Sequence, residues 1–165
     1  ELVTIAHGAE VQAGTGLGDV VAQARGGVPI RLEPGGPQDN QLDEISARGR
    51  IEYHVIGELE TAEVLSGETE ALTEAGKQAL STVVGEPTMA TFMQASRRFS
   101  RESELLTDAV RDVIEDVIDA DGTAAMAMLG QTVFALDHGL SDAGYDPGVT
   151  AIHPGGATLE PAPEL

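Results

Sequence analysis

From about residue 51 onward, the order of hydrophobic patterns leaves few possible folds. Ile51 to Ile56 alternates as a strand does, and a final apolar run, Val149 to His153, also indicates a strand. Between them, Thr123 to Met128 and Thr132 to Leu136 are short apolar runs around Leu129-Gly130-Gln131, which predicts a hairpin. The order strand, helices, two strands, helix, strand predicts an antiparallel sheet with helices on one face.

The helices of this region are predicted from apolar residues at three- and four-residue spacing. The first, from Ala71 to Val84, ends at Gly85-Glu86-Pro87, and Thr88 can cap the second. The third has the clearest stripe, with acidic residues on its other faces: Val110, Val113, Ile114, Val117 and Ile118. A short helix is predicted from Leu140 to Ala143. The predicted class is therefore α+β, with a ferredoxin-like βαββαβ arrangement.

The first part of the chain has a different pattern of hydrophobic residues and more glycine-rich turns. Leu2 to Val11 has the pattern of a helix without an N-cap, and Asp19 to Ala24 that of a short helix. Val28 to Leu32 alternates as a strand, and Glu33 to Asn40 is rich in Gly and Pro and predicts a loop. We expect one unit over residues 1–48, a second over 49–160 and a frayed tail over 161–165.

Charge and composition exclude several classes of function. The chain has 28 acidic and 9 basic residues and a net charge of -19, which argues against nucleic-acid binding. It contains no apolar run of the ~20 residues that span a bilayer and no signal-peptide pattern, so we expect a cytoplasmic protein without a membrane partner. It has no cysteine, which excludes disulfides and thiolate zinc sites, so any metal would be held by oxygen ligands.

The bases are eight Arg and one Lys, and the aromatics are few. This composition is similar to that of cytoplasmic proteins of salt-accumulating archaea, in which salt screens acidic repulsion. An acidic mesophilic protein is the alternative.

The most informative segment is the glycine-rich turn Gly14-Thr15-Gly16-Leu17-Gly18, followed by Asp19 and later by Gly26-Gly27. Glycine allows close approach of the backbone to a ligand, and a carboxylate fixed beside that approach can accept a proton from a hydroxyl. Asp19 could equally serve only as a helix N-cap. The turn lacks the spacing of the dinucleotide fingerprint, and no Lys-Ser/Thr follows, so Rossmann and P-loop sites are not supported.

This segment resembles the GHMP small-molecule kinases, whose motif reads Gly-x-Pro-Ser-Gly-x-Asp followed by Gly-Gly at the same interval. Within that superfamily it is most similar to the archaeal pantoate kinases, over Thr15 to Gln23, Gly26-Gly27, Ile30-Arg31 and Pro34 to Pro37. A second stretch, Gly130 with Thr132 to Leu136, is similar to the third motif of the superfamily.

The resemblance implies which part of a kinase the chain represents. Residues 1–48 would form the C-terminal end of the N-terminal domain of a GHMP kinase, and residues 49–160 would form its ferredoxin-like C-terminal domain. The ATP-phosphate loop of the superfamily would precede Glu1. We therefore expect this chain by itself not to bind ATP productively.

The resemblance also implies roles for individual residues. Asp19 would be the catalytic base, ATP the phosphoryl donor, and Mg²⁺ a cofactor with Glu10 as its carboxylate ligand. Arg31 and Arg25 would bind the carboxylate of pantoate, with His7 as a further candidate. Gly16, Gly18 and Gly130 would let backbone approach the substrate. The structural alternatives are a solvated helix carboxylate for Glu10, a satisfied helix histidine for His7 and an apolar core hairpin around Gly130.

Two other functions stay open. One is a kinase for another small alcohol, such as homoserine or mevalonate. The other is a non-catalytic ferredoxin-like module that binds a small molecule or dimerises, and a homodimer is open in either case.

Overall fold

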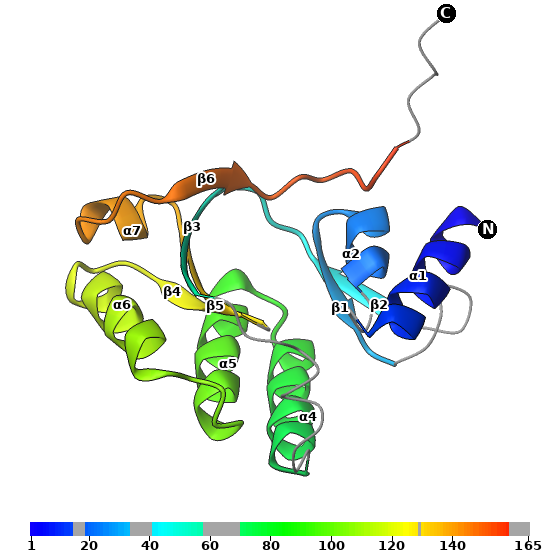
Figure 1. Ribbon diagram of the computed structural model, residues 1–165, viewed down its shortest axis with the longest axis horizontal. Helices are drawn as coiled ribbons and strands as arrows, with labels where there is room; N and C mark the ends of the chain where they lie inside the picture. Colours follow the sequence, from blue (N-terminus) through cyan, green and yellow to red (C-terminus); the bar gives the residue numbers. More distant parts are fainter. Residues whose placement is uncertain (15–18, 34–40, 58–69, 129, 159–165) are drawn as a thin grey trace, which may run out of the picture.

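The structure is a computed structural model that describes residues 1–14, 19–33, 41–57, 70–128 and 130–158 (Figure 1). The described residues of the first part form two helices and two strands: α1 (Leu2–Ala13), α2 (Asp19–Arg25), β1 (Val28–Arg31) and β2 (Leu42–Ile45). The second part contains four strands and four helices among the described residues: β3 (Arg50–Gly57), α4 (Glu70–Gly85), α5 (Met89–Glu102), α6 (Asp108–Asp119), β4 (Ala124–Ala127), β5 (Gln131–Leu136), α7 (Gly139–Asp142) and β6 (Gly148–Ala151). The predicted loop residues 34–40 and tail 161–165 lie outside the described residues.

The larger sheet has the strand order β4-β5-β3-β6, and every neighbouring pair is antiparallel. Strands β3 and β4 therefore run in the same direction with β5 between them, and β5 and β6 do so with β3 between them. These are the two interlocked split β-α-β units of a ferredoxin-like fold. The α+β class and the βαββαβ order predicted from the sequence are confirmed.

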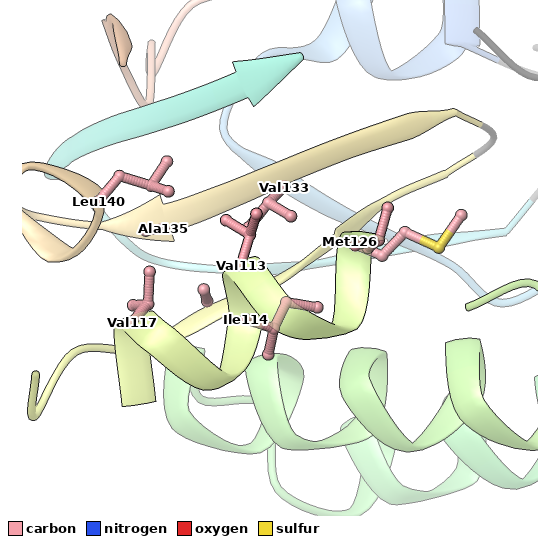
Figure 2. Close-up of a cluster of buried hydrophobic side chains, with 9 residues drawn as sticks. Val113, Ile114, Val117, Met126, Val133, Ala135 and Leu140 are labelled. Atoms are coloured by element: carbon pink, nitrogen blue, oxygen red, sulfur yellow. The ribbon is translucent and has the colours of Figure 1, made fainter. Parts of the chain in front are cut away.

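One face of this sheet forms the main core with α6 and α7 (Figure 2). Val110 and Val117 of α6 are fully buried against Val133 of β5. The helix begins where predicted by its stripe because Thr107 caps it, accepting a hydrogen bond from the N–H of Val110. Ile118, the last residue of the predicted stripe, is 45% exposed and lies outside this core.

Helices α4 and α5 do not cover that face, which corrects the expectation that the helices lie together on one side of the sheet. They pack against a separate two-stranded sheet, β1–β2, through a second cluster that includes Val83, Ala95 and Ile30. Helix α5 also contacts the edge strand β4 of the larger sheet, where Arg97 donates a hydrogen bond to the carbonyl of Ala124. Strand β2 was not predicted, because its residues Leu42-Asp43-Glu44-Ile45 alternate only weakly and pairing with β1 stabilises the strand. The predicted cap Thr88 of α5 is confirmed by its bond from the N–H of Thr91.

The chain after β6 returns to the first part of the protein (Figure 1). The N–H of Gly27 donates to the carbonyl of His153 at 2.7 Å, and the N–H of Ala157 donates to the carbonyl of Gln23 at 2.8 Å. Strand β6 ends at Ala151, two residues before the predicted end at His153. Gly26 has a φ of 72°, and a Cβ there would lie 2.4 Å from the carbonyl carbon of Gly155. The pair Gly26-Gly27 thus allows residues 153–157 to pack closely against the end of α2.

Candidate active site

Helix α1 turns two ionisable side chains toward the rest of the chain while several of its apolar residues are exposed. Its three least exposed positions are Val3, His7 and Glu10, which share one face at four- and three-residue spacing. Its apolar residues Leu2 and Ile5 are 61% and 63% exposed, and none of its residues is buried. The side of α1 that faces the rest of the chain is therefore the side that carries the two ionisable groups.

His7 and Glu10 form a close pair on that inner face. The distance between His7 Nδ1 and Glu10 Oε2 is 3.6 Å, and the two side chains are 13% and 10% exposed. Neither of these two atoms has a hydrogen-bond partner within the described residues, although both are buried. Buried polar atoms without partners cost free energy, and ligands, ions or water commonly satisfy them at functional sites.

Asp19 is the first residue of α2, and its side chain is exposed. Packing of α2 against α1 brings the start of α2 into the same part of the molecule as the His7–Glu10 pair. Gly16 and Gly18 lie outside the described residues, so the proposed turn stays a prediction. Asp19 is the first helical residue of α2, and no backbone N–H of the described residues donates to its carboxylate, so the alternative of an N-cap role is not supported. Within the described residues, no hydrogen bond or ion pair holds the Asp19 carboxylate, which leaves it available for proton transfer.

The two arginines predicted to bind an anion differ in their surroundings. Arg25 is exposed at the C-terminal end of α2, where a positive charge is favourable to the helix dipole. Arg31 ends β1 and is half-buried. Because Ile30 faces α4 and α5, Arg31 projects from the opposite face of the small sheet.

The hairpin between β4 and β5 reaches the first part of the protein. Met128, beside the turn, lines an apolar cavity of about 250 Å³ together with residues of β1, α4 and α5, among them Pro29, Leu80 and Phe92. A Cβ at Gly130 would meet only Thr132 Oγ1, at 3.8 Å, so the backbone at this turn is accessible. The fold thus brings the predicted Gly130 turn next to β1, the strand that carries Arg31.

No cluster of three or more His, Asp or Glu side chains suited to a metal ion is present in the described ranges. Mg²⁺, however, usually binds proteins through one or two carboxylates together with substrate phosphates and water. Glu10, with a buried oxygen that has no hydrogen bond in this part of the chain, fits that requirement. Its role as a metal ligand stays a prediction.

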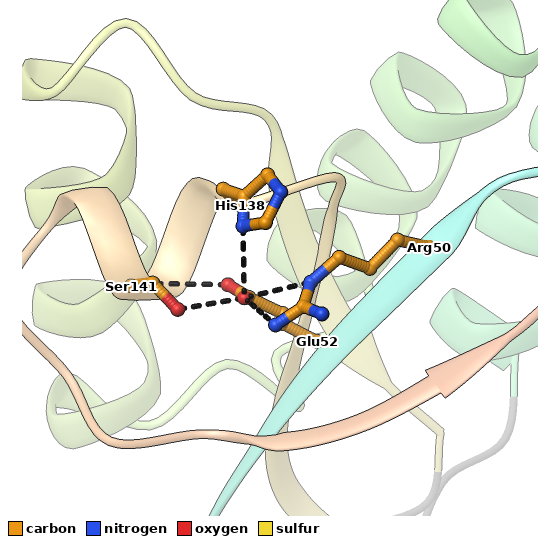
Figure 3. A network of polar contacts seen from close by, with 4 residues as sticks. All are labelled: Arg50, Glu52, His138 and Ser141. Atoms are coloured by element: carbon orange, nitrogen blue, oxygen red, sulfur yellow. Dashed lines mark hydrogen bonds and ion pairs between the residues drawn. The ribbon is translucent and has the colours of Figure 1, made fainter.

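A polar network that the sequence analysis missed lies in the larger sheet (Figure 3). Glu52 of β3 is fully buried and accepts hydrogen bonds from the Arg50 guanidinium at 2.8 Å and 3.1 Å. It also accepts from the N–H of Ser141 at 2.9 Å and from the Ser141 hydroxyl at 2.6 Å, while His138 Nδ1 lies 3.8 Å away. The network fixes α7 to β3.

This network sets the ionisation of Glu52. Burial raises the pKa of Glu52, but the hydrogen bonds from Ser141 and Arg50 outweigh burial and lower the pKa from 4.5 to about 2. A signal was present in the sequence: Glu52 shares a strand face with Ile56, which packs on the core, so a carboxylate there required partners.

No known protein-family profile matches the chain. It is similar to the pantoate kinase of Thermococcus kodakarensis, at 33% identity over 135 residues, covering 80% of this chain and 45% of that enzyme. The pantoate kinase of Methanocaldococcus jannaschii is 32% identical, with 80% and 49% covered, and that of Methanospirillum hungatei is 33% identical, with 82% and 45% covered. The chain thus spans about half the length of these curated relatives, and the resemblance indicated by its motifs is confirmed.

A solved structure described as a phosphotransferase related to the CoA biosynthesis pathway has a similar fold. It superposes with a TM-score of 0.77 over 93% of this chain and 55% of that chain, at 24% identity. This similarity shows that the two chains share a fold.

Proposed function

We propose that the protein is a small-molecule kinase that transfers the γ-phosphoryl group of ATP to pantoate, giving 4-phosphopantoate for coenzyme A biosynthesis. The observation that carries this proposal is the 32–33% identity to three pantoate kinases over about four fifths of the chain. The site geometry supports it, because α1 directs an acid and a histidine inward and α2 begins with an aspartate that has no bond in the described residues.

In this proposal Asp19 is the catalytic base. It accepts the proton of the pantoate hydroxyl as that oxygen attacks the γ-phosphorus, a new O–P bond forms, and the bond to the β–γ bridging oxygen breaks to release ADP. Such a transfer depends mainly on positioning and on neutralising the phosphate charge. The exposed position of Asp19 at the start of α2 leaves its carboxylate free to reach a bound alcohol.

The remaining candidate residues bind and orient the two substrates and Mg²⁺. Arg31, with Arg25 and His7 as further contacts, binds the carboxylate of pantoate, since guanidinium donates two parallel hydrogen bonds to such a group. The turns at Gly16, Gly18 and Gly130 give the substrate access to backbone. Glu10 holds Mg²⁺, which when bound neutralises the phosphates of ATP.

An assay of ADP release by the complete gene product tests the substrate. We expect a kcat/KM for pantoate that exceeds those for mevalonate and homoserine by at least about tenfold, a difference of about 1.4 kcal/mol in transition-state binding. A higher kcat/KM for mevalonate or homoserine would assign the protein to another alcohol. Absence of ATP-dependent turnover with all three would favour the non-catalytic module.

The variant Asp19→Asn tests the catalytic base. We expect kcat to fall by about 10²–10⁴-fold with the KM for pantoate largely unchanged, because general bases contribute rate enhancements of this size. The matched control is Asp119→Asn, which removes an exposed carboxylate from the end of α6. Equal activity of the two variants would exclude Asp19 as the base.

A further inference from the structure

Four of the nine basic residues of this acidic protein line one cavity. The chain has 9 basic residues and a net charge of -19. Four of its arginines, Arg97, Arg98 and Arg101 of α5 and Arg111 of α6, line a cavity of about 340 Å³ between these two helices. An anion repelled by the rest of the surface is therefore attracted to this place.

Two of these arginines are already neutralised. Arg98 Nε lies 2.7 Å from Glu102 and its Nη2 donates to Gln78 at 2.9 Å, while Arg111 Nη1 lies 2.7 Å from Asp108. The other two, Arg97 and Arg101, have no carboxylate within 4.0 Å among the residues that the structure describes. Arg97 donates one hydrogen bond, at 3.3 Å, to the carbonyl of Ala124. Most of the donors of this second pair are therefore available to a ligand.

The shape of the cavity indicates more than a bare ion. Arg97 and Arg101 are four residues apart, so they project from the same face of α5. Leu106, Ile114 and Ile118 form an apolar wall opposite, and Ile118 is 45% exposed. Glu115 also lines the cavity and sets a limit on how much negative charge it accepts.

We propose that this cavity binds an organic phosphate, with its phosphoryl group between Arg97 and Arg101 and its apolar part against Ile114 and Ile118. Guanidinium groups match phosphate oxygens through paired hydrogen bonds, and the volume is within the range of small-ligand sites.

The cavity is separate from the candidate active site. On α5, Phe92 and Phe99 face the apolar cavity beside β1, whereas Arg97 and Arg101 lie on the opposite face of the same helix. An organic phosphate bound here would not occupy the site of Asp19 and Arg31. The proposal goes beyond the kinase function and does not depend on it.

Methyl NMR of the complete protein, with phenyl phosphate and inorganic phosphate as probes, tests the proposal. We expect phenyl phosphate to shift the methyl signals of Ile114 and Ile118 and to bind more tightly than inorganic phosphate. Arg101→Gln should weaken phenyl phosphate binding at least about tenfold, because a charge-assisted hydrogen bond is lost. The control Arg48→Gln removes an exposed charge elsewhere and should change binding less than about twofold.

Three results would overturn the proposal. The first is the absence of methyl shifts at millimolar phenyl phosphate. The second is equal weakening by Arg101→Gln and Arg48→Gln, which would mean diffuse charge attraction. The third is a change of oligomeric state in Arg101→Gln, measured by light scattering without any effect on phenyl phosphate binding, which would assign the arginines to contact with a second copy of the chain. Kinase activity enters none of these readouts.

Discussion

Among single residues, Glu52 is the one fully buried charged side chain in the described part of the chain. Its two oxygens accept from Arg50 and from both the backbone and the hydroxyl of Ser141. A buried charge is tolerated only when it is paired and hydrogen-bonded in this way. The two hydrogen bonds from Ser141 join the short α7 to β3, and Leu140 of α7 packs in the core beside them.

We expect Glu52→Gln to destabilise the protein by about 3 kcal/mol, because it leaves the partly buried Arg50 without its ion-pair partner. The measurement is the free energy of unfolding in urea at neutral pH. Glu115→Gln, which replaces an exposed carboxylate on α6, is the control and should change this free energy by less than about 0.5 kcal/mol.

The same variant gives a pH dependence with a defined sign. Because the folded-state pKa of Glu52 is about 2, below the ordinary pKa of 4.5 for this side chain, its stabilisation is complete above pH 4.5 and is lost as the pH falls toward 2. The difference in unfolding free energy between Glu52→Gln and the unmodified protein should therefore shrink over that window. A difference that stays constant down to pH 2 would contradict the assignment.

Among the contacts between elements, residues 153–157 hydrogen-bond to α2 and to the residues that directly follow it. It depends on Gly26, where the backbone of Gly155 leaves no room for a side chain. Gly27 has nearly the same φ, +67° against +72°, but nothing lies within 4 Å of its Cβ position. The two glycines thus differ in space and not in backbone conformation.

This pair provides a matched experiment. Gly27→Ala should cost about 1 kcal/mol through the positive φ alone, whereas Gly26→Ala should cost more and release residues 153–157 from α2. Limited proteolysis of the C-terminal segment and urea unfolding measure the two effects. If both variants lose the same stability and resist proteolysis equally, the close approach of Gly155 does not contribute to the fold.

At the scale of the whole molecule, the net charge of -19 makes stability dependent on salt. Salt screens this repulsion, because the Debye length falls from about 10 Å at 0.1 M salt to about 3 Å at 1 M salt. We expect the urea midpoint to rise with KCl and the electrostatic part of this rise to level off near 1 M. A midpoint that is independent of KCl would mean that repulsion among the acidic residues does not limit the stability of the folded protein.

Within the described part of the chain, the helices fall short of the length or apolar character required to cross a lipid bilayer.

Residues 153–157 belong to the predicted second unit but contact α2 of the first. The boundary between residues 48 and 49 stays a prediction, as do the cytoplasmic location and the homodimer.

Elements with local signals can be predicted from the amino-acid sequence alone. The spacing of Val110, Val113 and Val117 predicted α6, and Thr88 caps α5 as predicted. The order of strands and helices along the chain predicted the ferredoxin-like sheet. The motif around Asp19 likewise indicated the relatives found by comparison. Such signals depend on residues within a few positions of one another, so they are visible before folding.

Contacts between residues that are distant in the sequence depend on the three-dimensional fold. Glu52 and Ser141 are 89 positions apart, and no local pattern pairs them. In the same way, the strand β2, the placement of α4 and α5 on the small sheet, and the convergence of arginines from α5 and α6 all result from contacts between separate elements. Their free energy comes from packing and desolvation, which depend on the complete three-dimensional arrangement rather than on sequence spacing.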